Sequence, residues 1–253
     1  MKEPLVSIIM PSYNTKNYIL GSIMSVSKQS YSNWELIIVD DCSTDGSGLF
    51  ISQLIKELDD IRIRVFREKI NKGAAYSRNI AMMNARGNYL AFLDSDDFWH
   101  SDKLKLQIDF MVTNNYSFTY HNYTAFDSLM QKKLYRVTGP AKLDYVGYAK
   151  NTIIGCLTVI IDKREFDDYR MPLIKSSQDM ALWLKLLRKV DYAFCLDSDL
   201  ANYRVLRRSN TSSKYKAAMD VWRVYRSIEK VDLLTSIYLF VNYSTNAVKK
   251  RII

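Results

Sequence analysis

Four short apolar runs divide the first hundred residues of the chain. They occupy residues 5–10, 36–39, 61–66 and 89–93, and the first is nearly continuous, which is typical of a strand buried on both faces. Between them, apolar residues recur at helical spacing over 14–29, 49–58 and 73–84. This alternation predicts right-handed crossovers and an α/β fold, with a mostly parallel central sheet flanked by helices.

The second half of the chain has a different pattern. Aromatic and β-branched residues are frequent at 117–126 and 132–138, as in a pair of antiparallel strands. The polar pair Asp197 and Ser198 predicts two short strands within 193–205. The remaining patterns predict a strand at 157–161, a polar loop at 208–213, and helices at 178–190, 215–229 and 231–248.

Two helix ends can be predicted from the residues that flank the helical segments. Asp45 and Ser47 stand where side chains cap the start of a helix, before the second helical segment. Arg86 and Gly87 follow the third segment, and glycine often ends a helix. We therefore expect side-chain capping at the first place and a glycine stop at the second.

Composition narrows the class of protein. A chain of 253 residues with 48% hydrophobic content supports a full core. The cysteines Cys42, Cys156 and Cys195 are widely spaced, and with only two histidines a structural zinc site is not expected. We expect reduced thiols in a cytoplasmic protein. The first apolar run is too short for a signal peptide, and no run reaches the ~18 residues that a membrane span needs.

The chain is basic, with 36 Lys and Arg against 27 acids and a net charge of +9. Such a balance fits nucleic acid, an anionic membrane or an anionic substrate. The bases are densest after Lys185, but they are not interleaved with aromatic residues in an RNA-binding signature. We therefore expect no nucleic acid partner.

Polar residues follow three of the predicted strands, at 11–14, at Asp40 with Asp41, and at 94–97. The carboxyl ends of parallel strands meet at one edge of a sheet, and ligands bind there. Crowded aspartates on such an edge can hold a divalent cation that also binds substrate phosphates. A calcium loop does not fit, because Phe98 and Trp99 fill its middle; a solvated acidic turn stays the alternative.

Three other residues have both a chemical and a structural interpretation. Gly73 begins a predicted helix whose N-terminus favours an anion, and Arg78, one turn later, can bind a base or phosphate. The alternative for both is simple helix capping and surface charge. Asp179 lies in the first turn of another predicted helix, where it is either a general base or a charge that stabilises the helix dipole.

In their order and spacing, these motifs resemble those of the family 2 glycosyltransferases with the GT-A fold. The resemblance covers about residues 4–210. The motifs that carry it are 6–14, 39–45, 71–73 with Arg78 and Asn79, 94–97, and Gln178 and Asp179 with Leu182 and Trp183.

The resemblance implies a Rossmann-like catalytic domain at 1–212 and a helical tail at 213–253. Within the domain, it assigns 1–97 to the nucleotide-sugar donor and 98–212 to the acceptor. The implied reaction is an inverting transfer from a nucleotide-diphosphate sugar, most often a UDP-sugar. The residues implied to bind the donor are Pro11, Tyr13, Asn14, Asp41, Gly73, Arg78, Asp94, Ser95, Asp96 and Arg204.

The same resemblance implies a Mn²⁺ or Mg²⁺ ion on Asp96 and Asp94, and Asp179 as the base that deprotonates the acceptor hydroxyl. Two positions depart from the family pattern: Gln178 replaces a common Glu, and Leu206 or Arg207 stands where many members have His. A third metal ligand is therefore not assigned. The residues expected on the acceptor side are Asp97, Gly155, Cys156 and Trp183.

Bacterial members of this family commonly build O-antigen, capsule or other surface polysaccharide. The implied acceptor is therefore a saccharide or a polyprenyl-diphosphate-linked sugar. The uncharged stretch 233–248 fits this setting, because Leu234, Ile237, Tyr238 and Val241 share one helical face and bases follow at 249–251. We expect peripheral contact with the inner, anionic face of the cytoplasmic membrane. Alternatively, this helix packs on the catalytic domain or in a homodimer.

Two other function classes fit the sequence less well. A nucleotidyltransferase of similar fold would need a glycine-rich phosphate loop with a basic residue near the N-terminus, and residues 11–14 supply neither. A non-catalytic basic module would bind nucleic acid through phosphates and would not depend on Asp179.

Overall fold

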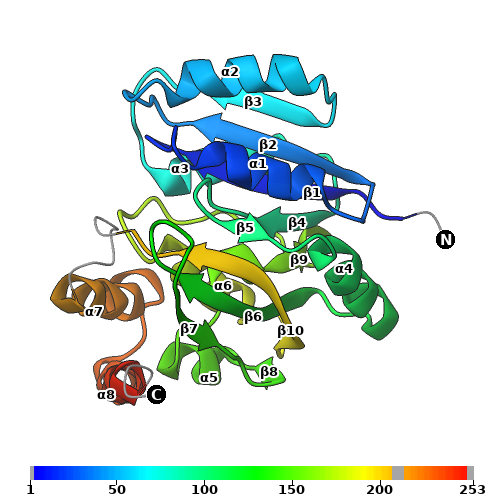
Figure 1. Ribbon diagram of the computed structural model, residues 1–253. Helices are drawn as coiled ribbons and strands as arrows, with labels where there is room; N and C mark the ends of the chain where they lie inside the picture. Colours follow the sequence, from blue (N-terminus) through cyan, green and yellow to red (C-terminus); the bar gives the residue numbers. More distant parts are fainter. Residues whose placement is uncertain (1–2, 207–213, 250–253) are drawn as a thin grey trace.

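The computed structural model describes residues 3–206 and 214–249 (Figure 1). Arg207, the predicted loop at 208–213, Lys250 and Arg251 lie outside the described residues. The predicted α/β fold is confirmed, with helices on both faces of a mostly parallel central sheet.

Ten strands of the described chain form one sheet. They are β1 (Val6–Ser12), β2 (Trp34–Asp40), β3 (Ile63–Arg67), β4 (Tyr89–Phe92), β5 (Phe98–Trp99), β6 (Phe118–Phe126), β7 (Lys133–Val137), β8 (Lys142–Leu143), β9 (Ile160–Asp162) and β10 (Ala193–Arg204). The α-helices are α1 (Ile19–Ser27), α2 (Ser47–Leu58), α3 (Ala74–Met83), α4 (Lys103–Asn114), α5 (Tyr145–Lys150), α6 (Gln178–Leu186), α7 (Lys214–Arg223) and α8 (Leu233–Lys249). Short 3₁₀ turns η1 (Cys156–Thr158) and η2 (Lys163–Glu165) and the π-helical turn η3 (Val224–Ile228) complete the elements.

The strand order is β3-β2-β1-β4-β9-β6-β10-β5, with β7 beside β6 and β8 beside β10. The strands β3, β2, β1 and β4 are parallel neighbours, as the sequence predicts. β9 runs antiparallel to both β4 and β6, while β6 and β10 are parallel. The antiparallel pair predicted at 117–126 and 132–138 is confirmed as β6 and β7.

Some local predictions are wrong. Residues 193–204 form one strand, because its ladder with β6 shifts register near Asp197 and Ser198 instead of ending there. The strand predicted at 157–161 begins as a 3₁₀ turn. Asp45 does not cap α2 in the expected way, since the residue before this helix is Gly46 with φ +87°, and Asp45 accepts hydrogen bonds from Ser47 instead.

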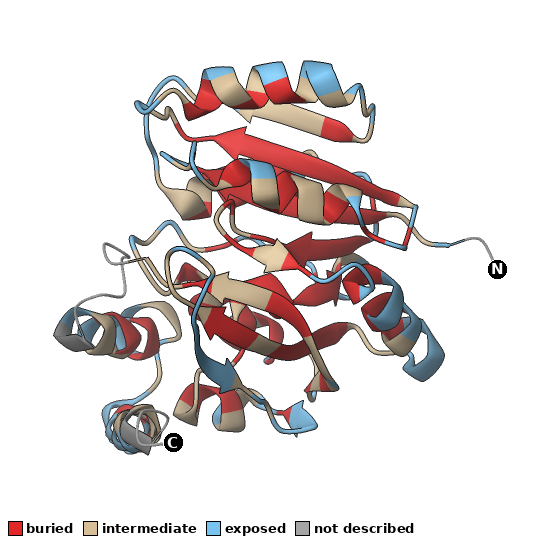
Figure 2. Ribbon diagram, viewed as in Figure 1, coloured by how far each residue is buried: buried red, intermediate tan, exposed pale blue. Residues whose placement is uncertain are grey.

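The central strands are buried along most of their length (Figure 2). Their side chains alternate and supply two separate cores, one on each face of the sheet. Ile8 of β1 and Ile38 of β2 point to the face covered by α1, α2 and α4. Ile9 and Ile37 point to the other face, covered by α3, α5, α6 and the C-terminal helices. Burial of both faces explains why these strands are continuously apolar in the sequence.

The C-terminal helices pack against the rest of the chain with one side only. The hydroxyl of Tyr225, in η3, donates a 2.6 Å hydrogen bond to the carbonyl of Ala149 in α5, and Leu239 of α8 is buried in the same core. On its other side α8 exposes apolar residues, which include Leu234, Ile237, Tyr238 and Val241. No helix in the described ranges is both long and apolar enough to cross a membrane.

Gly87 does not end α3, contrary to the expectation, because the residue that follows this helix is Asn84. Gly87 is required instead for close packing at the start of β4. Its N–H donates to the Ser7 hydroxyl at 2.8 Å, and that hydroxyl donates to the buried carboxylate of Glu35 at 2.6 Å. A Cβ at position 87 would lie 2.4 Å from the carbonyl oxygen of Leu5.

Gly87→Ala should therefore lower the free energy of unfolding by about 1–3 kcal/mol, the usual cost of forcing extra volume into a packed site. Urea unfolding followed by circular dichroism measures this change. Asn88→Ala, which alters an exposed neighbour, is the control and should stay within about 0.5 kcal/mol. Unchanged stability of Gly87→Ala would contradict the tight contact with Leu5.

Candidate active site

The carboxyl ends of β1, β2 and β4 bring the three predicted polar segments to one edge of the sheet. Ser12 and Asp40 are register partners, and the Asp41 N–H donates to the carbonyl of Ser12 at 2.8 Å. Leu93, which precedes the acidic turn 94–97, donates to the carbonyl of Ile9. We call this edge the rim.

The first rim segment holds its neighbour through Asn14. The side-chain oxygen of Asn14 accepts a 2.8 Å hydrogen bond from the Thr44 N–H, and its own N–H donates to the Ser43 hydroxyl at 2.9 Å. Asn14 adopts a left-handed φ of 54°. Pro11 is buried within β1, whereas the ring of Tyr13 is 47% exposed. Tyr13 and Asn14, which is also exposed, are therefore the members of this segment that a ligand can reach.

Asp41 organises the loop before α3. Its carboxylate accepts hydrogen bonds from the N–H groups of Lys72 at 2.9 Å and Gly73 at 2.7 Å. Gly73 has φ +90°, a conformation that other residues rarely adopt, although a Cβ there would meet open space. The glycine is thus explained by its backbone angle, not by a close approach of other atoms.

Arg78 and the acidic turn are in direct contact. The guanidinium of Arg78, only 6% exposed, donates a hydrogen bond to the carboxylate of Asp94. Burial opposes the charge of Arg78, but the carboxylates of Asp94 and Asp179 outweigh it and raise the pKa of Arg78. Burial, with the nearby charge of Asp94, raises the pKa of Asp96 to about 6. The turn therefore holds more negative charge than its protein partners neutralise.

Asp97 and Arg204 form hydrogen bonds on the buried side of this acidic turn. The carboxylate of Asp97 accepts the backbone N–H of Arg204 at 2.8 Å, and burial raises the pKa of Asp97 well above the usual range. The Arg204 guanidinium donates to the carbonyls of Asp96 at 2.9 Å and Ser128 at 2.5 Å. Arg204 is 7% exposed, and its guanidinium carbon also lies 4.8 Å from the ring centroid of Tyr18 and 5.0 Å from that of Phe98. The contact of Arg204 with phosphate stays a prediction. Ser95 is also buried.

Asp179 lies in the first turn of α6, across the rim from the acidic turn. Burial raises its pKa, and the positive charge of Arg78 opposes that rise. Within the described residues, its carboxylate accepts no side-chain hydrogen bond and forms no ion pair. Ser177, just before the helix, has a left-handed φ of 58°. A carboxylate that is partly exposed, with a raised pKa and a cation nearby, can accept a proton from a substrate.

Aromatic and small residues lie within electrostatic range of this carboxylate. Burial raises the pKa of Cys156 well above its usual value, so its thiol stays protonated and is a poor nucleophile. A Cβ on Gly155 would lie 3.0 Å from the ring of Tyr123. Burial raises the pKa of Tyr123 and of Tyr148, and the charge of Asp179 adds to both effects.

Trp183 differs from its expected position on the acceptor side. Its side chain is fully buried and packs edge-on against Phe92, with ring centroids 5.2 Å apart, and against Phe118 at 5.5 Å. It therefore belongs to the core beneath the site. Trp183 lies about one helical turn after Asp179. That part of α6 faces the sheet, so the large ring of Trp183 is buried there.

Sequence reasoning missed three residues that shape the site. No family motif includes Tyr123 or Tyr148, and only the aromatic richness of 117–126 points toward the first of them. Asn79 belongs to a family motif, but the sequence assigns it no role. Its side chain exchanges two 2.8 Å hydrogen bonds with the backbone of Met171 and so ties α3 to the segment that precedes α6.

Across the described residues, no group of three or more His, Cys, Asp or Glu side chains forms a metal site. Asp94 and Asp96 nevertheless offer two carboxylates on one turn. The raised pKa of Asp96 shows that a further positive charge would be favourable there. These residues fit a cation that takes its remaining ligands from substrate phosphates and water.

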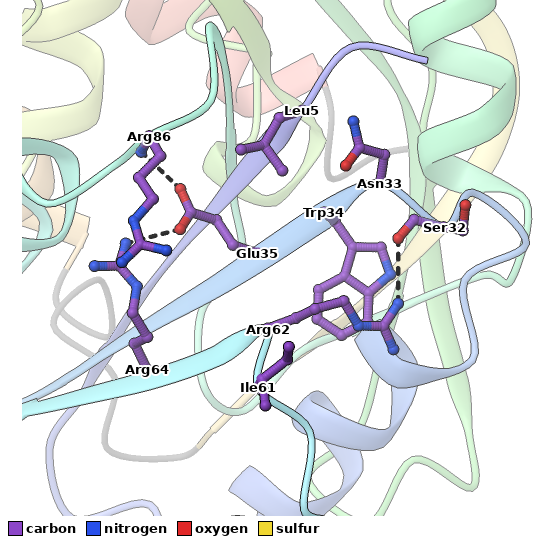
Figure 3. Close-up of a pocket in the computed structure, with 9 residues that line it drawn as sticks. All are labelled: Leu5, Ser32, Asn33, Trp34, Glu35, Ile61, Arg62, Arg64 and Arg86. Carbon is purple, nitrogen blue, oxygen red and sulfur yellow. Dashed lines mark hydrogen bonds and ion pairs between the residues drawn. The ribbon is translucent and has the colours of Figure 1, made fainter. Parts of the chain in front are cut away.

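A separate cavity of about 230 Å³ lies at the opposite ends of β2 and β3 (Figure 3). Arg62 stacks 3.8 Å above Trp34 there, and Glu35 accepts hydrogen bonds from Arg64 at 2.7 Å and from the Arg86 N–H at 2.6 Å. Because ligands of such sheets bind at the carboxyl ends of the strands, this cavity is not the candidate active site.

Comparison with known proteins identifies the chain's relatives. Residues 7–162 match the family model described as glycosyl transferase family 2. A Bacillus subtilis (strain 168) protein named for teichuronic acid biosynthesis, the glycosyltransferase TuaG, is 46% identical over 252 residues, 99% of this chain and 98% of that protein. The Escherichia coli UDP-Glc:alpha-D-GlcNAc-diphosphoundecaprenol beta-1,3-glucosyltransferase WfgD is 38% identical over 251 residues, 99% of this chain and 96% of that protein.

The fold also matches a solved structure. The mannosyltransferase PcManGT from Pyrobaculum calidifontis, in complex with GDP-Man and Mn²⁺, superimposes with a TM-score of 0.72 at 14% identity, over 98% of this chain and 75% of that chain. That likeness supports the GT-A fold alone. With the family model covering most of the sheet, the chain belongs to glycosyl transferase family 2.

Proposed function

We propose that this protein transfers a sugar from a nucleotide-diphosphate sugar to a hydroxyl group, with inversion at the anomeric carbon. The observation that carries this proposal is Arg78, whose guanidinium contacts the carboxylate of Asp94 and lies within electrostatic range of the carboxylate of Asp179. One side of this arrangement suits a donor diphosphate and its counter-ion. The other side holds a carboxylate with a raised pKa that is suited to accept a proton.

In the proposed reaction, the acceptor hydroxyl oxygen forms a bond to the anomeric carbon while the bond from that carbon to the diphosphate oxygen breaks. The hydroxyl proton passes to the Asp179 carboxylate, and the bonding electron pair leaves with the nucleoside diphosphate. Inversion follows because attack and departure take place on opposite faces of the sugar. Tyr13, Asn14 and Asp41 lie where the base and ribose of the donor would bind.

The donor proposed for this chain is a UDP-sugar and the acceptor a polyprenyl-diphosphate-linked saccharide, in line with the name of the Escherichia coli relative. Building a bacterial surface polysaccharide is the corresponding process, as in the name of the Bacillus relative. Asp96 and Asp94 would hold Mn²⁺ or Mg²⁺ on the donor diphosphate. When bound, the ion neutralises negative charge on the leaving group.

The exposed side of α8 is proposed to rest on the membrane that carries the acceptor. Leu234, Ile237, Tyr238 and Val241 lie on it, and Lys230 precedes the helix. Amphipathic helices with this pattern lie in the headgroup region, and each base near an anionic surface adds about 1 kcal/mol of attraction. The protein would then bind at the inner face of the cytoplasmic membrane.

The first test is the base. Asp179→Asn should reduce kcat by about 10²–10⁴-fold, the usual contribution of a general base, and leave donor affinity within about twofold. In the wild type, kcat should fall as pH falls through the raised pKa of Asp179, because protonation removes the acceptor of the proton. This acid limb should lie above the ~3.9 of an ordinary aspartate. Turnover near the wild-type rate in Asp179→Asn would refute the assignment.

The second test is the metal. Asp96→Ala should remove the gain in UDP affinity that Mn²⁺ provides, by about tenfold or more, because one charge-assisted contact contributes about 1.5–3 kcal/mol. Calorimetric titration of UDP with and without Mn²⁺ measures it. Asp109→Ala removes an exposed aspartate of α4 and is the control. A Mn²⁺-dependent gain that survives in Asp96→Ala would count against this metal site.

The third test is the membrane. Replacing Leu234, Ile237 and Val241 together by serine should weaken binding to vesicles that contain anionic lipid by at least about tenfold, since each replacement removes apolar area from the interface. Co-sedimentation with the vesicles measures the change.

The matched control replaces Leu49, Ile61 and Ile70, three exposed apolar residues elsewhere, by serine. Binding should then be retained. A different result would be that the wild type does not bind vesicles and forms a dimer in analytical ultracentrifugation that the α8 triple variant does not form. A second copy of the chain would then be the partner of this face.

A further inference from the structure

The segment 166–177, which leads into the helix of Asp179, is fastened to two different parts of the chain. We call it the pre-base segment. Near its middle, Asn79 of α3 exchanges two hydrogen bonds with the backbone of Met171. Near its end, the hydroxyl of Ser176 donates a hydrogen bond to the carboxylate of Asp220 in α7. The second anchor comes from beyond the residues that match the family model.

Asp220 is held in place on both sides. Its side chain is buried, with 7% exposure, and its second oxygen lies 3.6 Å from the Arg223 guanidinium one turn later in α7. A buried carboxylate is costly unless hydrogen bonds and charges satisfy it, so its position is well defined. The Ser176 hydroxyl is one of those partners.

The backbone next to Ser176 needs such support. Ser177 has a left-handed φ of 58°, which costs free energy in a residue with a Cβ. Its carbonyl accepts the hydrogen bond from the Ala181 N–H that begins α6. The direction of the first turn of α6, and with it the direction of the Asp179 carboxylate, therefore depends on how residues 176 and 177 are held.

Helix α7, which supplies Asp220, packs into the core together with the turn η3 that follows it. Val221 of α7 and Val224 and Tyr225 of η3 are buried in the same core as α6. The α6 residues of that core include Met180 and Leu182. In Figure 1, α7 lies on the side toward which the arrows of β2 and β10 point, the side of the rim. The C-terminal region thus reaches the segment beside Asp179 through a buried, polar contact.

We infer that Asp220 is a positioning residue, which holds Ser176 and thereby aims the carboxylate of Asp179 at the acceptor hydroxyl. This inference rests on the proposed function, in which Asp179 is the base. Asp220 itself touches no substrate. The C-terminal helices accordingly help to position the base, in addition to carrying the exposed apolar face of α8.

Asp220→Ala and Ser176→Ala should each lower kcat by about tenfold to a hundredfold, the effect of a displacement of about 1 Å in a reacting group. The affinity for UDP, measured by calorimetry, should change less than twofold, because the donor side of the rim is untouched. The double variant should be no slower than the slower single variant, since both changes remove one contact. Asp220→Asn keeps an acceptor oxygen for Ser176 and should restore most of kcat.

Tyr225→Phe is the matched control. It deletes a buried hydrogen bond of the same C-terminal region, to Ala149, without touching the pre-base segment. It should lower the melting temperature about as much as Asp220→Ala while kcat stays within about twofold of the wild type. All rates are measured well below the lowest melting temperature.

Two results would overturn the inference. One is kcat within about twofold of the wild type in Asp220→Ala and Ser176→Ala, with Asp179→Asn inactive; the proposed function would then stand without the positioning role. The other is an equal loss of kcat in Tyr225→Phe, which would mean that any loosening of the C-terminal helices slows the enzyme. An active Asp179→Asn would instead refute the proposed function, and the inference with it.

Discussion

The rim is built around one buried cation among carboxylates. Arg78 is almost fully buried and its guanidinium contacts Asp94, while Asp179 lies within range of the same charge. A buried guanidinium is unfavourable unless anions satisfy it, and crowded carboxylates are unfavourable unless cations do. Each group therefore stabilises the charge of the other. Burial and the charge of Asp94 raise the pKa of Asp96, so a cation bound there with the donor, as proposed, would be favourable.

Parallel strands are what bring these charges together. The residues involved come from the ends of β1, β2 and β4, from α3 and from α6, and are separated by up to 168 positions in the chain (11 to 179). The two apolar cores on either side of β1 and β2 fix the register of those strands, since a shift by one residue would move every side chain to the opposite face and disrupt the packing of both cores. Polar groups at the strand ends are consequently held in one place.

The sequence was informative where a signal is local. Continuous apolar runs predicted the parallel strands, and polar residues at their ends predicted the rim. It was misleading where the outcome depends on distant partners. For Arg204 no sequence signal indicates its contacts with the carbonyls of Asp96 and Ser128, and its phosphate contact stays a prediction. Trp183 shares a helix with Asp179, but only the packing of Phe92 and Phe118 decides that its ring is buried. Helix α4 has a weak apolar period and gave no prediction.

The tail shows how two interpretations of one pattern can both apply. The sequence left open whether 231–248 packs on protein or on membrane, because an amphipathic helix satisfies either. In the structure, Leu239 faces the core and Ile237, Tyr238 and Val241 face outward. A helix with apolar residues on two sides can pack on the domain without losing its exposed face. Because α7 contacts α8 and also holds the pre-base segment through Asp220 and Ser176, the same packing connects the exposed apolar face of α8, the proposed membrane surface, to Asp179, the proposed base.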